Sequence, residues 1–223
     1  MFTVAVIGQK GGNGKTTVAI ELATTAAAVG EDVAVIDLDP QASAAKWRDR
    51  RTVDNPAVVS AQVSRLRQTL TAAKTNGADL VVIDSPGKSD SAAVEAARVA
   101  DLVLIPTRPG VFDMETLPAI RDLLRIAGNP SAFVLFNHMH PQGNRIADEF
   151  KGLTMGYADL PACPVHLCQR ASYADAPTAG KAVHEIEPEG KAAAELQRLY
   201  LWVKAELGKE REPHEETKHA SRA

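Results

Sequence analysis

The chain has 223 residues, a formal net charge of −3 and 45% hydrophobic residues, with only 4% aromatic. No apolar run approaches the ~18 residues of a membrane span, and the slightly negative charge does not mark a nucleic-acid binder, although it leaves room for a local basic face. The length and composition predict one globular domain with a core of Ala, Val, Leu and Ile side chains.

The two cysteines, Cys163 and Cys168, are separated by four residues. This spacing fits neither a redox C-x-x-C motif nor a four-ligand zinc site, so free thiols are expected. An apolar run begins at residue 2 and leaves no room for a signal peptide. We therefore expect a cytoplasmic protein.

Short apolar runs alternate with helical segments along most of the chain. The runs lack strict apolar–polar alternation, which is typical of strands buried on both faces of a parallel sheet. The expected strands are 2–8, 32–37, 57–60, 79–84, 102–106 and 131–137, with a weaker one at 164–168. The expected helices are 15–29, 41–51, 62–76, 89–99, 114–128, 144–155 and 189–207. This order predicts an α/β fold with a single doubly wound, mostly parallel sheet and helices on both faces.

Two features refine these boundaries. Pro118 fits badly inside a helix that begins at 114, so that helix is expected to start near Thr116. From Lys209 onward the residues are polar and charged, which indicates a segment without a packed core. The predicted organisation is one domain at 1–208, followed by a charged tail at 209–223.

The segment between the first strand and the first helix carries the strongest functional signal. Residues 10–17 read Lys-Gly-Gly-Asn-Gly-Lys-Thr-Thr. Glycines allow successive backbone N–H groups to face a phosphate, Lys15 adds a positive charge, and the Thr16 hydroxyl suits Mg²⁺. The sequence therefore predicts a P-loop that binds ATP with Mg²⁺. The predicted nucleotide-binding residues are Gly11, Gly12, Asn13, Gly14, Lys15, Thr16 and Thr17.

The loop departs from the usual Walker pattern, because Gln9 occupies the position of its first glycine. It matches the deviant form K-G-G-x-G-K-[ST]-[ST], which has an additional lysine, Lys10. In this it resembles the ParA/MinD-type ATPases. The resemblance implies that Lys10 reaches across a dimer interface to the phosphates bound by the partner subunit. The alternative is a solvated surface lysine.

Acidic residues follow two of the expected strands, where a parallel sheet would bring them to the P-loop. Asp84 occupies the Walker B position, which holds a water of the Mg²⁺ shell. Asp37-Leu38-Asp39-Pro40-Gln41 resembles the family's switch I motif, and Ser85-Pro86-Gly87 resembles switch II. The resemblance implies that Asp39 orients the attacking water and Asp37 supports the metal shell; a simple Asp-Pro turn is the alternative. The expected catalytic residues are Lys10, Lys15 and Asp39, and the expected metal-site residues are Thr16, Asp37, Asp39 and Asp84.

Two later residues are functional candidates on the resemblance alone. Asn137 lies where the family places an Asn on the adenine edge, although an Asn after a strand is also a common turn residue. Residues 169–183 resemble the A-P-x-x-G-K-x-V block of the partition ATPases and, with Trp47, look most like the short ParF-type plasmid branch. Arg170 in this block is a candidate for DNA contact, and a loop-bracing arginine is the alternative. The resemblance covers about residues 1–205.

The resemblance implies an ATP-switched partition ATPase. Mg²⁺ and ATP would close a homodimer, which would bind nonspecific DNA at the nucleoid in a salt-dependent manner. A ParB-like, centromere-binding adaptor would trigger hydrolysis and drive segregation of plasmid or chromosomal DNA. No residue stands out as a built-in arginine finger, which predicts slow intrinsic turnover.

Other functions on the same scaffold stay open. A MinD-like or related ATPase could position a protein cargo or a transfer complex. Membrane-surface association would need an amphipathic carboxyl-terminal helix, and 209–223 has no apolar face, so no membrane partner is expected. A nitrogenase-like iron protein or a ligase is a third alternative, but the cysteines do not follow the switch strands and no substrate-specific motif is present.

Overall fold

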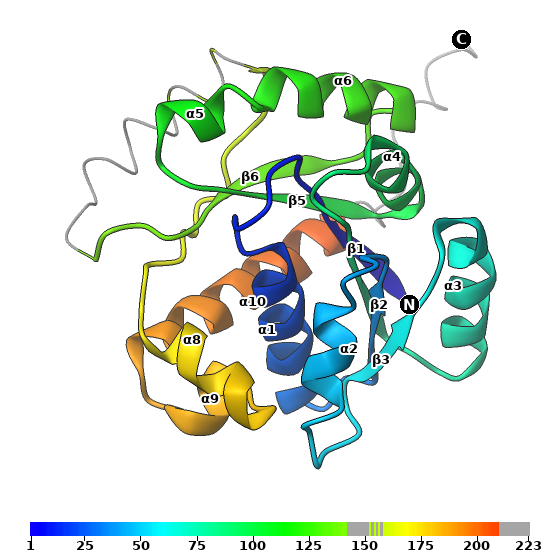
Figure 1. The fold of residues 1–223 in the computed structure, drawn as a ribbon, viewed down its shortest axis with the longest axis vertical. Helices are drawn as coiled ribbons and strands as arrows, with labels where there is room; N and C mark the ends of the chain where they lie inside the picture. Colours follow the sequence, from blue (N-terminus) through cyan, green and yellow to red (C-terminus); the bar gives the residue numbers. More distant parts are fainter. Residues whose placement is uncertain (142–151, 153, 155, 157, 210–223) are drawn as a thin grey trace, which may run out of the picture.

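A six-stranded parallel sheet forms the centre of the computed structural model, which describes residues 1–141, 152, 154, 156 and 158–209 (Figure 1). The strand order is β3-β2-β4-β1-β5-β6, and every pair of neighbours is parallel. The strands are β1 (Phe2–Val6), β2 (Val33–Asp37), β3 (Ala57–Ser60), β4 (Leu80–Asp84), β5 (Leu102–Thr107) and β6 (Ala132–Phe136). The predicted α/β fold is therefore confirmed.

Helices cover both faces of the sheet (Figure 1). One layer contains α1 (Lys15–Ala28), α2 (Ser43–Arg48), α8 (Ser172–Asp175), α9 (Val183–Ile186) and α10 (Lys191–Lys209), with the 3-10 turn η2 (Ala176–Ala179). The opposite layer contains η1 (Val63–Arg65), α3 (Leu66–Thr75), α4 (Asp90–Val99), α5 (Val111–Met114) and α6 (Leu117–Ala127). None of the described helices is both long and apolar enough to cross a bilayer.

Alternate residues of each strand enter different cores. Val4 and Val6 of β1 pack with α1 and α10, whereas Ala5 and Ile7 pack in the cluster that includes α4 and α6. This two-residue period is the geometry of a strand buried on both faces, and it explains the continuous apolar runs in the sequence. Trp47 of α2 is fully buried in the first cluster.

The weak strand expected at 164–168 is wrong. Within this segment only Cys168 forms a bridge, with Met139, and a second isolated bridge joins Val134 to Ala162 just before it. Pro164 lies between the two bridges and lacks the N–H group that a continuous ladder needs.

Two expected helices differ in extent. The helix expected at 114–128 is α6, which begins at Leu117 with Pro118 in its first turn, in agreement with the expected start near Thr116, and Met114 ends the separate helix α5. The helix expected at 41–51 is only α2, because Ala42 before it has a left-handed φ of 52°. The helix expected at 144–155, and the tail beyond 209, lie largely or wholly outside the described residues.

Candidate functional site

The loop after β1 has the backbone of an anion site. Gly12 and Gly14 adopt left-handed φ values of 81° and 83°, and α1 begins directly afterwards at Lys15. No described side chain caps the amino-terminal end of α1. Its free N–H groups and the positive end of its dipole therefore face the loop, where a phosphate would be stabilised. Gly11 and Gly12 are exposed, whereas Asn13 is buried.

Asn137 lies directly against this loop. Its amide Nδ2 donates a hydrogen bond to the carbonyl of Asn13 at 2.9 Å, and its Oδ1 accepts one from the backbone N–H of His138. A Cβ on Gly14 would lie 2.3 Å from the Asn137 Nδ2, so only glycine permits this contact. The structure thus brings together the P-loop and the residue expected at the adenine edge.

A small pocket of about 210 Å³ opens beside Asn137. Its lining joins the start of α1 to the chain that follows β6: Thr17, Asn137, His138, Cys168, Gln169, Arg170, Tyr173 and Ala174. This is the position in which the base of a nucleotide on the P-loop could be accommodated. Sequence reasoning missed residues 168–174 as a wall of the site, because only the tertiary fold brings them to α1.

Arg170 is committed to a contact inside the protein. Its guanidinium forms an ion pair with Glu195 of α10, and the same carboxylate accepts the backbone N–H of Cys168 at 3.0 Å. The Arg170 partner and the Cys168 N–H hold the pKa of Glu195 below its usual value, although burial opposes them. This arrangement matches the loop-bracing alternative for Arg170 and does not support the expected DNA contact.

Lys15 points into the loop and not into solvent. The residue is 7% exposed, and its Nζ donates to the carbonyl of Lys10 at 2.9 Å. Burial lowers the pKa of Lys15, while the carboxylates of Asp84 and Asp39 act in the opposite direction. The ammonium group therefore lies within the field of two of the three acids, Asp39 and Asp84, that the sequence assigned to the metal site.

Asp84 is the most buried acid of the site. It is 0% exposed, and neither carboxylate oxygen has a hydrogen-bond partner among the described residues. Burial raises its pKa to about 7; the Thr16 hydroxyl and Lys15 oppose this, and Asp37 and Asp39 reinforce it. Two buried oxygens without partners, beside a threonine hydroxyl at a phosphate loop, are hard ligands that suit a hydrated Mg²⁺ ion.

The Asp37 carboxylate is occupied by backbone donors. One oxygen accepts the N–H of Asp39 at 3.0 Å, and the other accepts the N–H groups of Ala44 and Ala45 at the start of α2. Burial raises the pKa of Asp37, whereas these hydrogen bonds lower it. Asp37 and Asp84 are register partners on adjacent strands, so Asp37 holds the switch I loop next to the Walker B acid.

Asp39 sits at the tip of that loop and is half-buried. Its Oδ1 accepts the backbone N–H of Gln41 at 2.9 Å, which leaves the second oxygen available to a ligand. The Asp39 carboxylate is also close enough to Lys15 to raise the pKa of that lysine against the effect of burial.

Lys10 contacts its own subunit in this structure. Its Nζ donates to the carbonyl of Phe112 and lies 3.7 Å from Asp113 Oδ1, with the side chain 37% exposed. Arg108, on the same connection after β5, donates to the carbonyl of Gly12. These contacts were not predicted, because residues 10 and 108–113 are far apart in the chain.

Switch II also approaches the loop. A Cβ on Gly87 would lie 2.9 Å from the Lys15 Nζ and 3.1 Å from the Lys10 carbonyl oxygen. A side chain at position 87 would therefore crowd the P-loop backbone and displace the Lys15 ammonium group.

Comparison with known proteins decides the family. Residues 4–183 match the CobQ/CobB/MinD/ParA nucleotide binding domain. The chain belongs to this family. It is 32% identical over 209 residues to the maintenance of carboxysome distribution protein A of Gloeobacter kilaueensis, covering 93% of this chain and 94% of the relative. It is 26% identical over 241 residues to the chromosome-partitioning ATPase Soj of Thermus thermophilus, covering 92% and 96%.

A solved structure of this family supports the same fold. The septum site-determining protein MinD of Pyrococcus horikoshii, complexed with Mg-ADP, matches with a TM-score of 0.75 at 17% identity, covering 95% of this chain and 99% of that one. The CobQ/CobB/MinD/ParA membership makes this chain a P-loop nucleotide-binding protein of a family that includes ATPases. The ParA/MinD-type resemblance drawn from the deviant loop is confirmed.

Proposed function

We propose that this protein is a ParA-type positioning ATPase whose Mg²⁺- and ATP-bound form is a homodimer. The observation that carries the proposal is the deviant loop itself, in which Lys10 accompanies Lys15 and Thr16, with the unpartnered oxygens of Asp84 beside the loop as candidate ligands for the metal.

Each residue of the site has a separate part in hydrolysis. Lys15 and the N–H groups from Gly11 to Thr17 would bind the phosphates, and Thr16 and Asp84 would hold the hydrated metal. Bound Mg²⁺ supplies charge neutralisation to the phosphates. Asp39 orients the attacking water in line and accepts its proton, while Asp37 keeps the Asp39 loop in place through its backbone hydrogen bonds.

Dimerisation requires Lys10 to change partners. In the subunit described here it is held by the Phe112 carbonyl and Asp113, and both contacts are at the surface. A surface ion pair of this kind contributes little stability, about 0–1 kcal/mol. The phosphates of a nucleotide in a second subunit would offer Lys10 a more strongly charged partner.

The cargo is the finer part of the proposal. The relatives named for chromosome partitioning favour segregation of DNA as the first candidate. In this candidate the dimer would bind nonspecific DNA, a ParB-like adaptor would stimulate hydrolysis, and the cargo would be plasmid or chromosomal DNA. The relative named for carboxysome distribution, which matches over nearly the full length of both chains, favours a second candidate, the positioning of a protein body. Both candidates use the same ATP switch and differ in the adaptor.

DNA binding across a salt series tests the switch that both candidates share. The protein with ATP and Mg²⁺ is expected to bind a fluorescent random-sequence DNA duplex. Its affinity should fall steeply as the salt concentration rises, because lysine and arginine contacts to phosphates release counterions. ADP should give little binding, and Lys15→Ala should remove the difference between the nucleotides. DNA binding that is equal with ATP, with ADP and without nucleotide would refute the proposal.

A further inference from the structure

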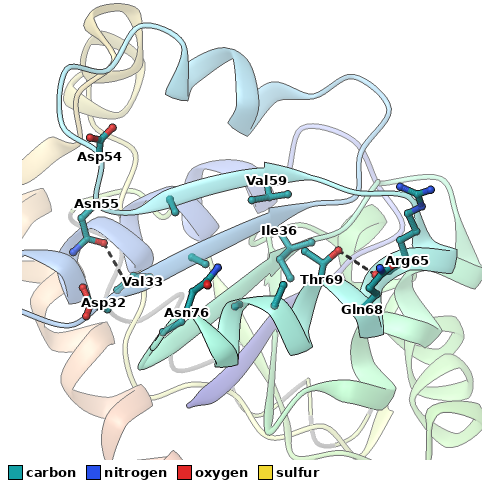
Figure 2. A pocket seen from close by; sticks show the side chains of 15 residues that line it. Asp32, Val33, Ile36, Asp54, Asn55, Val59, Arg65, Gln68, Thr69 and Asn76 are labelled. Carbon is teal, nitrogen blue, oxygen red and sulfur yellow. Dashed lines mark hydrogen bonds between the residues drawn. The ribbon is translucent and has the colours of Figure 1, made fainter.

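A groove lies between the edge strand β3 and helix α3 (Figure 2), and its lining includes Ile36, the residue before Asp37. It has a volume of about 640 Å³, within the range of ligand-binding pockets. Its apolar lining residues are Val33, Ala34, Ile36, Ala57, Val59, Ala72, Ala73 and Ala78, and its polar ones are Asp32, Asp54, Asn55, Arg65, Gln68, Thr69 and Asn76.

The groove exists because this end of the sheet lacks a covering helix. α2 packs on the other face of β3, whereas α3 packs against β2 and α4 and leaves Val59 of β3 45% exposed. Only Leu66 of α3 is buried, and the groove side of this helix presents Gln68 and Thr69 together with the small residues Ala72 and Ala73. The position beside α3 and over β3 is therefore open, whereas Ala34 and Ile36 of β2 are already buried.

The two ends of the groove carry opposite charge. Figure 2 places Asp32 and Asp54 at one end and Arg65 at the other. Asp79 adds a third carboxylate at the acidic end, where it accepts the backbone N–H of Asp32 at 3.0 Å. Arg48 offsets part of this charge through its contact with Asp54, whose side chain is 97% exposed.

We propose that this groove binds an amphipathic helix of the adaptor protein, an assignment of the partner that rests on the proposed function. The apolar stripe of such a helix would cover Val59 and the floor of the groove, in the helix-in-groove mode of recognition. A helix of about 14 residues is long enough, because α3 beside it has 10 residues and spans ~15 Å.

The charges also set the direction of the bound helix. Its amino-terminal end, which carries the positive end of the helix dipole, is placed at Asp32 and Asp54, and its carboxyl-terminal end at Arg65. Since α3 starts beside Arg65, the bound helix runs antiparallel to α3. A basic side chain near its amino end and an acidic one near its carboxyl end complete the complementarity.

Fluorescence anisotropy with a synthetic probe tests this proposal on the full chain. The probe is a labelled helical peptide of about 14 residues, with leucines at i, i+3, i+4 and i+7, arginine at its amino end and glutamate at its carboxyl end. One control peptide has the same composition with the leucines spread around the helix. A second has the two charged ends exchanged.

A pair of variants on α3 localises the binding. Ala72→Glu places a carboxylate in the groove, whereas Thr71→Glu adds the same charge to the same helix at an exposed position outside the groove lining. Because a buried carboxylate without a partner is costly, Ala72→Glu should weaken probe binding by about tenfold or more. Thr71→Glu should leave it within about twofold, as expected of a charge at a solvated position. Both control peptides should bind more weakly than the probe.

The remaining outcomes overturn the proposal. These are no probe binding, equal binding of the peptide without an apolar face, or equal effects of the two variants. If a second copy of the chain covers the groove, the nucleotide-free protein will be a dimer that Ala72→Glu dissociates, and that result also overturns it. The peptide assay needs no nucleotide, so its failure would leave the proposed ATP switch untouched. Conversely, a protein that binds the probe but does not dimerise with ATP would contradict the proposed switch and not the groove.

Discussion

The two edges of this molecule are built in different ways. At the carboxyl ends of β1, β2 and β4, glycines, buried acids and Lys15 are packed so closely that a single Cβ on Gly14 would collide with Asn137. At the β3 edge, small side chains leave a groove, and one face of the strand is open. Substitutions in the P-loop site should be costly, because its chemistry depends on the exact positions of these side chains. The β3 groove can accept a partner helix, because packing there is incomplete.

The largest effect is expected at Lys15. Lys15→Ala removes the ammonium group from the phosphate loop and should weaken ATP binding by about 100-fold or more, or ~3 kcal/mol, the scale of hydrogen bonds to charged groups. Titration with a fluorescent ATP analogue measures this. Lys74→Ala, an exposed lysine on α3, is the control. Equal affinities of the two variants would show that the loop does not hold the phosphates.

Two glycine-to-alanine replacements distinguish backbone strain alone from backbone strain combined with a steric clash. Gly14→Ala and Gly30→Ala both force alanine into a left-handed conformation, with φ of 83° and 91°. Gly30 has open space around its Cβ position, whereas Gly14 faces Asn137. Gly30→Ala should cost ~1 kcal/mol of unfolding free energy, and Gly14→Ala ~1–3 kcal/mol more. Denaturant melts of both variants test this, and equal costs would mean that the Asn137 contact is not close.

The helix behind the P-loop carries a buried acid whose titration should affect stability. Glu21 of α1 is 1% exposed, and burial raises its pKa to about 8, although the Val183 N–H opposes this. The unfolded chain loses this proton near pH 4.5, while the folded protein keeps it until about pH 8. Unfolding free energy should therefore fall as pH rises from 4.5 to 8.

Glu21→Gln should remove that pH dependence. Relative to the unmodified protein, the variant should gain at least about 1 kcal/mol between pH 5 and pH 8, the equivalent of one pKa unit. Parallel urea melts at the two pH values measure the difference. The same slope in both proteins would show that Glu21 is ionised in the fold.

The smallest effect is expected at the open edge. Val59 is 45% exposed, so Val59→Thr should change unfolding free energy by less than about 0.5 kcal/mol. The comparison is with Val4→Thr at the fully buried centre of β1, which should cost several times more. A large cost at Val59 would mean that the β3 face is more closely packed than the groove implies.

Much of the phosphate site could be predicted from sequence. Parallel strands end at one edge of a sheet, so Asp37 and Asp84, each at the end of an apolar run, had to meet the loop after β1. The register pairing of Asp37 with Asp84 confirms that placement. The hydrogen-bond partners of these two carboxylates could not be predicted. Asp37 accepts hydrogen bonds from backbone N–H groups, whereas Asp84 has no partner among the described residues.

Contacts between distant segments account for the misses. The Lys10–Asp113 and Arg170–Glu195 pairs join residues with no local pattern that relates them. The groove is not predictable from sequence, because Ala72 and Ala73 are ordinary helix residues and their effect depends on how far α3 lies from β3. Pro164, by contrast, is a sequence signal against a strand at 164–168.

The central claim is that Lys10 completes the nucleotide site of a second subunit, and the molecular mass of the hydrolysis-blocked protein tests it most directly. Light scattering on Asp39→Ala with ATP and Mg²⁺ should show a dimer, and adding Lys10→Ala should return it to the monomer while one ATP still binds to each chain. A monomeric Asp39→Ala protein, or a dimer that persists without the lysine at position 10, would contradict the account.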